Sequence, residues 1–391
     1  MLLSEQETLA RVLESVGQLN VENTSIWEAG NRVLARDIVA TVSLPRFDNS
    51  TVDGYAVRAA DAVDGAQLTI SGEQSAGLDL ALRVGPGEAV RIYTGAPIPL
   101  DADAVVMQED VNRTGKSLLI REGVTRGENI RVRGGDLCEG QVVASRGTLL
   151  NPSILAAIAS QGLAELPVFK RPRVAIIATG SELRRQGEPS GAGEIYETNR
   201  VLLAQLARTT GARDDVFDIV PDTEEAHVQG FERARSYDAI LVAGGMSVGT
   251  KDLVKPVLQK LGARLDLWRV AIKPGKPFVF GRLGDALIFG LPGNPVSAFV
   301  TFLLFVRPAF LKLGGHSTWT LPHASAALKE ELVNDGDRPH YMRGVYCERT
   351  FSPVGRQESH ALFALSRANA LCRVEAGQTI ASDSIIDVIL I

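Results

Sequence analysis

The chain has 391 residues, of which 45% are hydrophobic, 22% charged and 6% aromatic, and its formal net charge is -5. This length exceeds what one hydrophobic core usually holds, and the composition excludes wholesale disorder, so we expect roughly two to four globular domains. The acidic balance offers no broad positive field for nucleic acid or anionic lipid, and three cysteines far apart form neither a disulfide scaffold nor a zinc motif. We therefore expect a cytoplasmic protein that binds neither nucleic acid nor a membrane.

Residues 1–170 contain short apolar runs rather than alternating strands and helices. Ser4 and Glu7, at capping-box spacing, begin a predicted helix that ends near Gly17. Runs broken by glycine and proline then predict a mainly β module, with strands at 55–57, 67–70, 89–94, 104–107 and 117–120. Pro152 favours the start of a second helix at 154–162, and residues 166–172 are interpreted as a linker.

The rhythm changes between residues 173 and 315, where apolar strands alternate with amphipathic helices. Strands are predicted at 174–178, 216–220, 239–243 and 286–289, and helices at 198–209, 224–235, 253–261 and 295–313. This alternation predicts a doubly wound parallel sheet covered on both faces. The most apolar stretch, 296–306, is too short to cross a bilayer and is interpreted as buried helix. Short strands such as 343–347 and 385–391 predict a small β domain over 321–391.

Several predicted strands of this sheet end in loops rich in glycine. The loops begin at Thr179, at Gly244-Gly245 and at Gly290. Ligands of open α/β sheets bind beyond the carboxyl ends of the strands, where glycine lets backbone N–H groups approach oxyanions. One such loop is commonly only a tight turn, whereas three at one edge predict a site for a phosphate-bearing ligand.

Three carboxylates, Glu182, Asp222 and Asp252, follow strands at the same edge. Acidic side chains crowded near an anion imply an intervening cation, and ligand sets made only of oxygen suit Mg²⁺. Each carboxylate alone is more commonly a helix cap or a first-turn acid. Their convergence favours a metal and catalytic role.

The segment Ile272-Lys273-Pro274-Gly275-Lys276-Pro277 sets two lysines in a rigid frame of proline and glycine. Two ammonium groups beside Ser247 and Ser297 would form a pocket for a small tetrahedral oxyanion, although a charged exposed turn is the alternative. The loop 187–193, rich in glycine, proline and serine, either closes over a ligand or is an idle surface loop.

A series of motifs resembles the molybdopterin molybdenumtransferase family, in order and nearly throughout the chain. They are Asn49-Ser50 with Asp53-Gly54-Tyr55-Ala56, Thr94-Gly95-Ala96-Pro97, Val105-Val106-Met107-Gln108-Glu109, Thr179-Gly180-Ser181-Glu182, Ile195-Tyr196-Glu197-Thr198-Asn199, residues 244–252, residues 273–277 and residues 290–297. Departures are small: Thr51-Val52 stands where Ala-Met is usual, and Met246 where valine is usual.

The resemblance implies a chain of four parts that acts as a homodimer. Residues 1–20 and 141–171, with 39–47, would form an elongated domain, and 21–38 with 48–140 a β module. Residues 172–320 would form an α/β domain resembling the molybdopterin adenylyltransferase, and 321–391 a C-terminal β barrel. In such dimers the pocket lies between the β module of one subunit and the α/β domain of the other.

The resemblance also implies the activity and the residues that perform it. Molybdate would be inserted into molybdopterin-AMP with Mg²⁺, giving molybdenum cofactor and AMP. The catalytic positions would be Asp53, Thr94, Glu182, Asp222 and Asp252, the last three also binding the metal. Substrate would be bound by Arg131, Gly244, Gly245, Ser247, Lys273, Lys276, Ser297, Arg338 and Ser366. Transient contact with the adenylyltransferase and with apo-molybdoenzymes would follow.

Two alternatives remain at this point. The chain could catalyse the preceding adenylyl transfer, although residues 1–170 and the C-terminal β domain would then be superfluous, or it could be a non-catalytic scaffold of the same fold. Consumption of ATP with free molybdopterin would indicate the first. Retention of the active-site carboxylates argues against the second.

Overall fold

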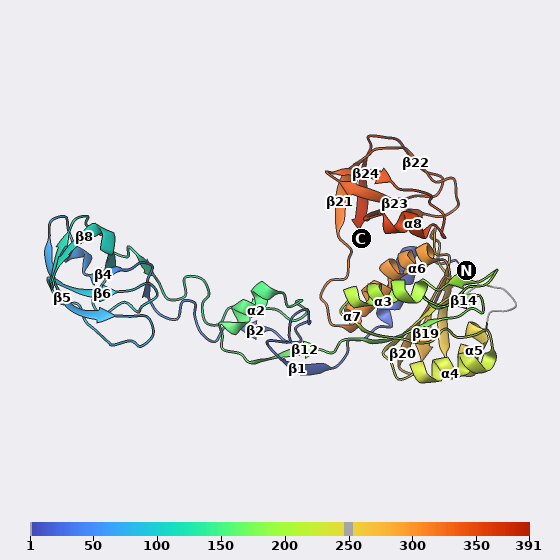
Figure 1. Cartoon of the computed structure of the whole chain (residues 1–391), viewed down its shortest axis with the longest axis horizontal. Helices are drawn as coiled ribbons and strands as arrows, with labels where there is room; N and C mark the ends of the chain where they lie inside the picture. Colours follow the sequence, from blue (N-terminus) through green and yellow to red (C-terminus); the bar gives the residue numbers. More distant parts are fainter. Residues whose placement is uncertain (1, 246–252) are drawn as a thin grey trace. The chain divides into compact units, whose positions relative to one another are not determined.

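The computed structural model describes residues 2–245 and 253–391 (Figure 1). The chain forms two compact units. The first unit comprises Met1–Arg36, Arg146–Asn151 and Glu165–Ile391, and the second unit comprises Asp37–Ser145 and Pro152–Ala164. Because their mutual arrangement is not determined, each unit is described by itself.

The second unit is built around a six-stranded sheet with the strand order β7-β4-β6-β5-β9-β8. All five strands predicted for the β module are present, together with β8; the strands are β4 (Gly54–Val57), β5 (Gln67–Gln74), β6 (Glu88–Ile92), β7 (Ala104–Met107), β8 (Val111–Thr114) and β9 (Ser117–Ile120). Alternate residues such as Leu68 and Ile70 of β5 enter one hydrophobic core, which explains the short apolar runs. The unit also contains β2 (Ile38–Val39), β3 (Asn49–Ser50), β10 (Ile130–Arg131), β11 (Val142–Ala144) and α2 (Pro152–Ala159).

The second unit is inserted into the first at neighbouring backbone positions. Strand β1 (Val21–Ser25) pairs antiparallel with β12 (Glu165–Phe169). Leu34 N–H donates to the carbonyl of Thr148 at 3.0 Å, and Gly147 N–H donates to that of Leu34 at 2.7 Å. The chain leaves the first unit after Arg36 and returns to it at Arg146, and residues next to these two points are hydrogen-bonded to each other.

Two sequence interpretations in this region differ from the structure. The predicted linker 166–172 begins inside β12, and β1, which was assigned to the β module, pairs with β12 instead of joining the six-stranded sheet. Leu166 and Val168 are fully buried, in the alternation of a half-buried strand. Pro167 suggested a break, yet the strand continues through it: Pro167 pairs with Asn23 of β1, and its carbonyl accepts from the N–H of Ala35 at 2.9 Å.

The α/β domain contains a six-stranded sheet with the order β16-β13-β17-β20-β19-β18. The parallel arrangement is confirmed for four strands: β16 (Arg213–Val216), β13 (Arg173–Ala178), β17 (Ala239–Ala243) and β20 (Ala286–Leu291). Two antiparallel strands, β19 (Pro277–Leu283) and β18 (Arg264–Arg269), were not predicted. The strand predicted at 216–220 lies earlier and ends at Val216.

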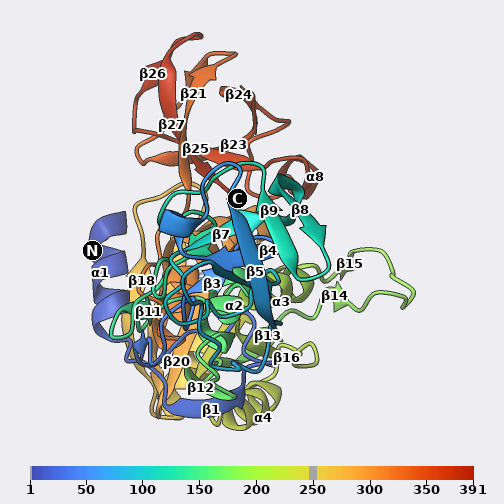
Figure 2. The same ribbon diagram turned by 90° about the vertical axis from the view of Figure 1, so that its left-hand side faces the viewer.

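Helices cover both faces of this sheet, as the sequence rhythm predicted. On one face lie α1 (Glu5–Glu14), α3 (Asn199–Thr209), α6 (Pro295–Thr301) and α7 (Arg307–Leu313), and on the other α4 (Glu224–Ala234) and α5 (Val254–Lys260) (Figures 1 and 2). Successive residues of β13 alternate between the two cores: Val174 and Ile176 enter the first, Ala175 and Ile177 the second. Such alternation places apolar residues on both sides and gives the continuous hydrophobic run.

Residues 295–313 form one continuous helical segment, in which a π-helical turn, Phe302–Val306, joins α6 to α7. Its 19 residues and mean hydropathy of 1.7 meet the requirements of a membrane span. However, 78% of the apolar window is buried inside the protein, as in the core helix of a globular domain.

The C-terminal region is a closed barrel with the strand order β21-β24-β23-β25-β27, which confirms the predicted small β domain. Its strands are β21 (His323–Leu328), β23 (His340–Cys347), β24 (Thr350–Pro353), β25 (Ala370–Val374) and β27 (Ile385–Leu390). A short helix, α8 (Leu362–Ser366), precedes β25. The barrel contacts the α/β domain through a parallel bridge between Lys273 and His340.

Candidate active site

A cavity of about 780 Å³ lies at the carboxyl ends of β13, β17 and β20, and we call it the site cavity. β13 and β17 end at its wall, at Ala178 and Ala243, and the wall residue Pro292 directly follows the end of β20 at Leu291. The site cavity includes seven of the residues predicted from sequence: Glu182, Gly244, Gly245, Lys273, Lys276, Ser297 and Arg338. Ser247 and Asp252 lie outside the described residues.

The two lysines are held in the frame of proline and glycine that the sequence indicated. The backbone of Lys273 is bonded on both sides to the barrel: its N–H donates to the Pro339 carbonyl at 2.8 Å, and its carbonyl accepts from Tyr341 N–H at 2.7 Å. Gly275 has φ +121°, and a Cβ there would lie 2.6 Å from Cγ2 of the buried Thr301. The frame is therefore packed tightly against α6.

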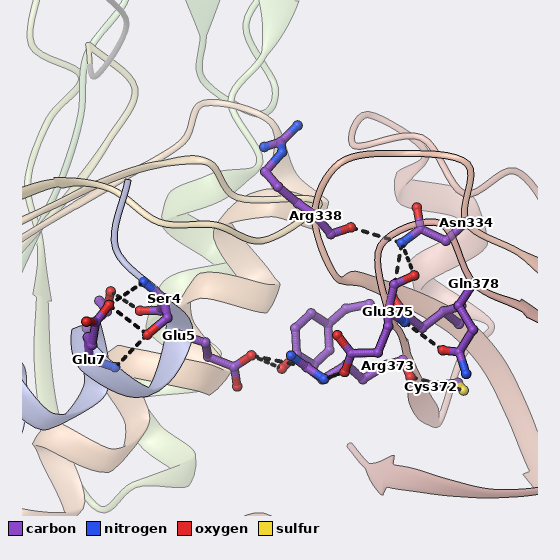
Figure 3. Close-up of polar contacts among 12 residues, drawn as sticks. Ser4, Glu5, Glu7, Asn334, Arg338, Cys372, Arg373, Glu375 and Gln378 are labelled. Atoms are coloured by element: carbon purple, nitrogen blue, oxygen red, sulfur yellow. Dashed lines mark hydrogen bonds and ion pairs between the residues drawn. The ribbon is translucent and has the colours of Figure 1, made fainter. Parts of the chain in front are cut away.

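Arg338 adds a third cation, which the barrel contributes. Its Nη1 donates to the Ile272 carbonyl at 3.1 Å, and its Nε bonds Asp337 at 3.0 Å, an interaction that lowers the pKa of that carboxyl. Asn334, only 1% exposed, donates through Nδ2 to the carbonyls of Arg338 and Glu375 at 2.9 and 2.8 Å (Figure 3). A buried side-chain amide thus fixes the backbone of this cavity arginine.

The predicted metal ligands are only partly within the described residues. Glu182 lines the site cavity, whereas Asp222 does not, although it accepts a hydrogen bond of 3.0 Å from the N–H of Ser181. A Cβ at Gly180 would lie 2.8 Å from both carboxylate oxygens of Glu182, so glycine leaves the space that this carboxylate occupies. Within residues 2–245 and 253–391, no group of three or more His, Cys, Asp or Glu side chains is placed to hold a metal ion.

This pair of carboxylates nevertheless fits Mg²⁺ in chemistry. Glu182 and Asp222 supply oxygen donors on adjacent loops at the sheet edge, and Mg²⁺ is typically bound by one or two carboxylates together with substrate phosphates. Full ligation would need further oxygens.

Three predicted site residues, Asp53, Thr94 and Arg131, belong to the second unit. The Asp53 carboxylate accepts from the N–H of Thr94 at 2.8 Å and from its hydroxyl at 2.9 Å. These two bonds hold the pKa of Asp53 below its usual value, so the group is ionised at neutral pH. Arg131 is exposed on β10, opposite Asn49 of β3.

Ser366 is not among the residues that line the site cavity. It is exposed at the end of α8, and its hydroxyl donates to the Phe363 carbonyl at 2.9 Å. Another barrel serine, Ser359, lines the cavity with Gln357 and Glu358, and its hydroxyl accepts from Asn294 Nδ2 at 2.8 Å.

Sequence reasoning missed this barrel loop because neither glycine punctuation nor the end of a predicted strand marks it. It also gave no role to Glu197 and Asn199, which line the cavity at the start of α3. Glu197 is 2% exposed and pairs with Arg200 at 2.9 Å, and Asn199 Nδ2 donates to the Gly293 carbonyl at 2.6 Å. The only sequence signal for these two residues was their place in the family motif at 195–199.

The loop 187–193 connects two short parallel strands, β14 (Leu183–Arg184) and β15 (Ile195–Tyr196). Leu183 and Ile195 line the site cavity, whereas residues 187–193 do not. Closure of this loop over a ligand stays a prediction.

These features define a class: a multidomain α/β protein whose parallel sheet edge, together with a β barrel, forms a cavity with three cations for an anionic ligand. Comparison with protein families identifies three successive regions. Residues 3–162 match the MoeA N-terminal region (domain I and II), residues 175–312 a probable molybdopterin binding domain, and residues 325–391 the MoeA C-terminal region (domain IV).

Individual relatives agree over nearly the whole chain. The molybdopterin molybdenumtransferase of Haemophilus influenzae is 37% identical over 396 residues, covering 97% of this chain and 98% of the relative. Molybdopterin molybdenumtransferase 2 of Mycobacterium tuberculosis is 36% identical over 94% of this chain and 93% of its own. The crystal structure of the molybdopterin biosynthesis MoeA protein of Pyrococcus horikoshii OT3 is 30% identical, with a TM-score of 0.86 and all of both chains covered. The chain therefore belongs to the molybdopterin molybdenumtransferase family.

Proposed function

We propose that this protein is a transferase that inserts molybdenum into molybdopterin, using molybdate and adenylylated molybdopterin and releasing AMP. The observation that carries the proposal is the convergence of Lys273, Lys276 and Arg338 on one cavity beside the loops of the parallel sheet edge. In a net-acidic protein without a broad positive field, three cations lining one cavity favour a bound anion.

The cavity cations and the sheet-edge loops bind different substrates: the cations bind molybdate, and the loops bind the phosphate groups of the adenylylated substrate. Lys273 and Lys276 hold the molybdate oxygens as point charges, and Arg338, a planar fork of donors, adds orientation. The loop at Gly244-Gly245 offers backbone donors to the phosphate groups of the adenylylated substrate. Holding both substrates in one cavity converts a bimolecular step into a local one.

Mg²⁺ is the proposed metal, with Glu182, Asp222 and Asp252 as its ligands. When bound, it would neutralise charge on the phosphoanhydride during cleavage. Glu182 supports this assignment because it lines the cavity proposed to hold the phosphate groups.

We also propose that the protein is a cytoplasmic homodimer with Asp53, Thr94 and Arg131 completing the site of the partner subunit, as the family architecture implies. Asp53 supports this role because its ionised carboxylate is fixed by Thr94 on the exposed surface of the second unit. Transient contacts with the adenylyltransferase that supplies the substrate, and with apo-molybdoenzymes that receive the product, belong to the same proposal.

The decisive experiment is a release assay with purified full-length protein. Incubation with molybdopterin-AMP, Mg²⁺ and molybdate should release AMP, and omission of molybdate or chelation of Mg²⁺ should suppress the release. ATP consumption with free molybdopterin would instead indicate an adenylyltransferase. Absence of both reactions in folded protein would leave a non-catalytic scaffold and refute the proposal.

A further inference from the structure

The backbones of the two cavity lysines are each hydrogen-bonded to a residue outside the segment 272–277. The Lys276 carbonyl accepts from the N–H of Val270 at 3.0 Å, and the Lys273 carbonyl accepts from that of Tyr341 at 2.7 Å. Val270 follows β18 of the α/β domain, and Tyr341 lies in β23 of the barrel. The position of the lysine pair therefore depends on two elements that are far apart in sequence.

The N-terminal segment binds both of these elements. Leu3 forms a parallel bridge with Val270: its N–H donates to the Arg269 carbonyl at 3.3 Å, and its carbonyl accepts from Ala271 N–H at 2.8 Å. Two residues later, Glu5 accepts a hydrogen bond of 2.5 Å from the Tyr341 hydroxyl. Leu3 and Glu5 thus each contact a residue whose backbone N–H is bonded to a cavity lysine. Leu3 contacts Val270, which is bonded to Lys276, and Glu5 contacts Tyr341, which is bonded to Lys273.

The contact between Glu5 and Tyr341 is built to be specific. Tyr341 is 1% exposed and belongs to the same hydrophobic core as the α/β domain, so its ring cannot turn to another acceptor. Burial, and the Glu5 carboxylate beside it, raise the pKa of Tyr341 far above its usual range, which keeps the hydroxyl a donor. Arg373 Nε lies 3.4 Å from the same Glu5 oxygen and partly compensates its charge (Figure 3).

We propose that Glu5 and Tyr341 are positioning residues that fix the spacing of Lys273, Lys276 and Arg338, and thereby set the affinity of the site cavity for a tetrahedral oxyanion. The proposal rests on the proposed function of this cavity. It gives the N-terminal helix a part in ligand binding without contact with the ligand.

Molybdate titration of the full-length protein by calorimetry tests the idea, with molybdate dependence of AMP release measured in parallel. Tyr341→Phe and Glu5→Ala should each raise the molybdate dissociation constant and KM roughly threefold to tenfold while kcat stays unchanged, the size of effect typical of residues coupled to a site. Glu5→Gln keeps an acceptor for the hydroxyl and should restore most of the affinity.

The matched control is Glu7→Ala in the same helical turn. The Glu7 carboxylate accepts from the N–H and the hydroxyl of Ser4, at 2.9 and 2.8 Å, in the capping box. Its loss should lower the melting temperature without changing the molybdate affinity. Equal losses of affinity in Glu5→Ala and Glu7→Ala would reduce the effect to helix stability and overturn the proposal, as would unchanged affinity in folded Tyr341→Phe and Glu5→Ala.

The two readouts separate this proposal from the proposed function. Wild-type protein that binds molybdate yet releases no AMP would refute the function, and the dissociation constants of the variants would still decide the positioning role. Wild-type protein that binds no molybdate would overturn both.

Discussion

Gly275→Ala should damage the protein more than any change in an unconstrained glycine turn. Gly275 has φ +121°, and an added Cβ would lie 2.6 Å from Thr301 Cγ2 and 3.2 Å from Ile272 Cδ1. Thr301 is fully buried and its hydroxyl donates to the Ser297 carbonyl at 2.7 Å, so its methyl group cannot rotate away. The lysine frame must move instead.

The expected magnitude has two parts. Left-handed backbone strain costs about 1–2 kcal/mol for a residue with a Cβ, and overpacking a well-packed core costs about 1–3 kcal/mol. Urea unfolding followed by circular dichroism should therefore show a loss of about 2–5 kcal/mol in the free energy of unfolding. Because Gly275 lies between Lys273 and Lys276, the molybdate dissociation constant should rise as well.

Gly262→Ala is the control, because Gly262 has φ +83° and no atom within 4 Å of the added Cβ. It should lose only the strain of about 1–2 kcal/mol and keep its affinity for molybdate. Equal destabilisation by the two substitutions, or normal molybdate binding by Gly275→Ala, would refute the reasoning from close packing.

Three further predictions concern charge. Lys276→Ala should raise the molybdate requirement in the AMP release assay far more than it weakens binding of molybdopterin-AMP; equal losses for both ligands would contradict an oxyanion role. His340 is 3% exposed, and burial, assisted by Lys273, lowers its pKa from 6.5 to about 4. The free energy of unfolding should therefore fall by about 3 kcal/mol as the pH falls from 6.5 toward 4, because His340 of the unfolded chain takes up a proton first. His340→Gln should flatten that part of the pH profile of urea unfolding, and an unchanged profile would count against it. Finally, Asp53→Asn and Asp222→Asn homodimers should be inactive, whereas isolated mixed dimers, with both lesions in one site, should recover about half of the wild-type AMP release. Mixed dimers that remain inactive would exclude independent sites shared between subunits.

Local sequence patterns predicted those helices and strands in which a single spacing of apolar residues runs through the whole element. The buried strands β13, β17 and β20 and their helices follow from continuous apolar runs and helical periodicity. The antiparallel strands β18 and β19 break the alternation of parallel strands and helices, and β19 begins at Pro277, directly after the lysine frame. Their place depends on pairing with β20, which no local pattern specifies.

The candidate site was predictable where it consists of loops at the sheet edge and unpredictable where the barrel contributes. Glu182, Lys273 and Lys276 stand next to signals of strand ends or of a rigid frame. The barrel loop with Ser359 reaches the cavity only after the barrel closes and docks, so its sequence resembles an ordinary surface loop. For the same reason, local similarity around Ser366 selected a serine that does not line the cavity.

The insertion between Leu34 and Gly147 has a consequence for synthesis on the ribosome. Residues 37–145 emerge before Glu165, the pairing partner of Ser25, and long before the α7 residues against which α1 packs. Because domains generally fold as they appear during synthesis, we expect the β module to resist protease in stalled nascent chains while α1 and β1 are still cleaved. Protection of the N-terminal segment in those chains would contradict this order. If it holds, a substitution in α1 or β1 acts late, on a polypeptide whose inserted unit has already folded.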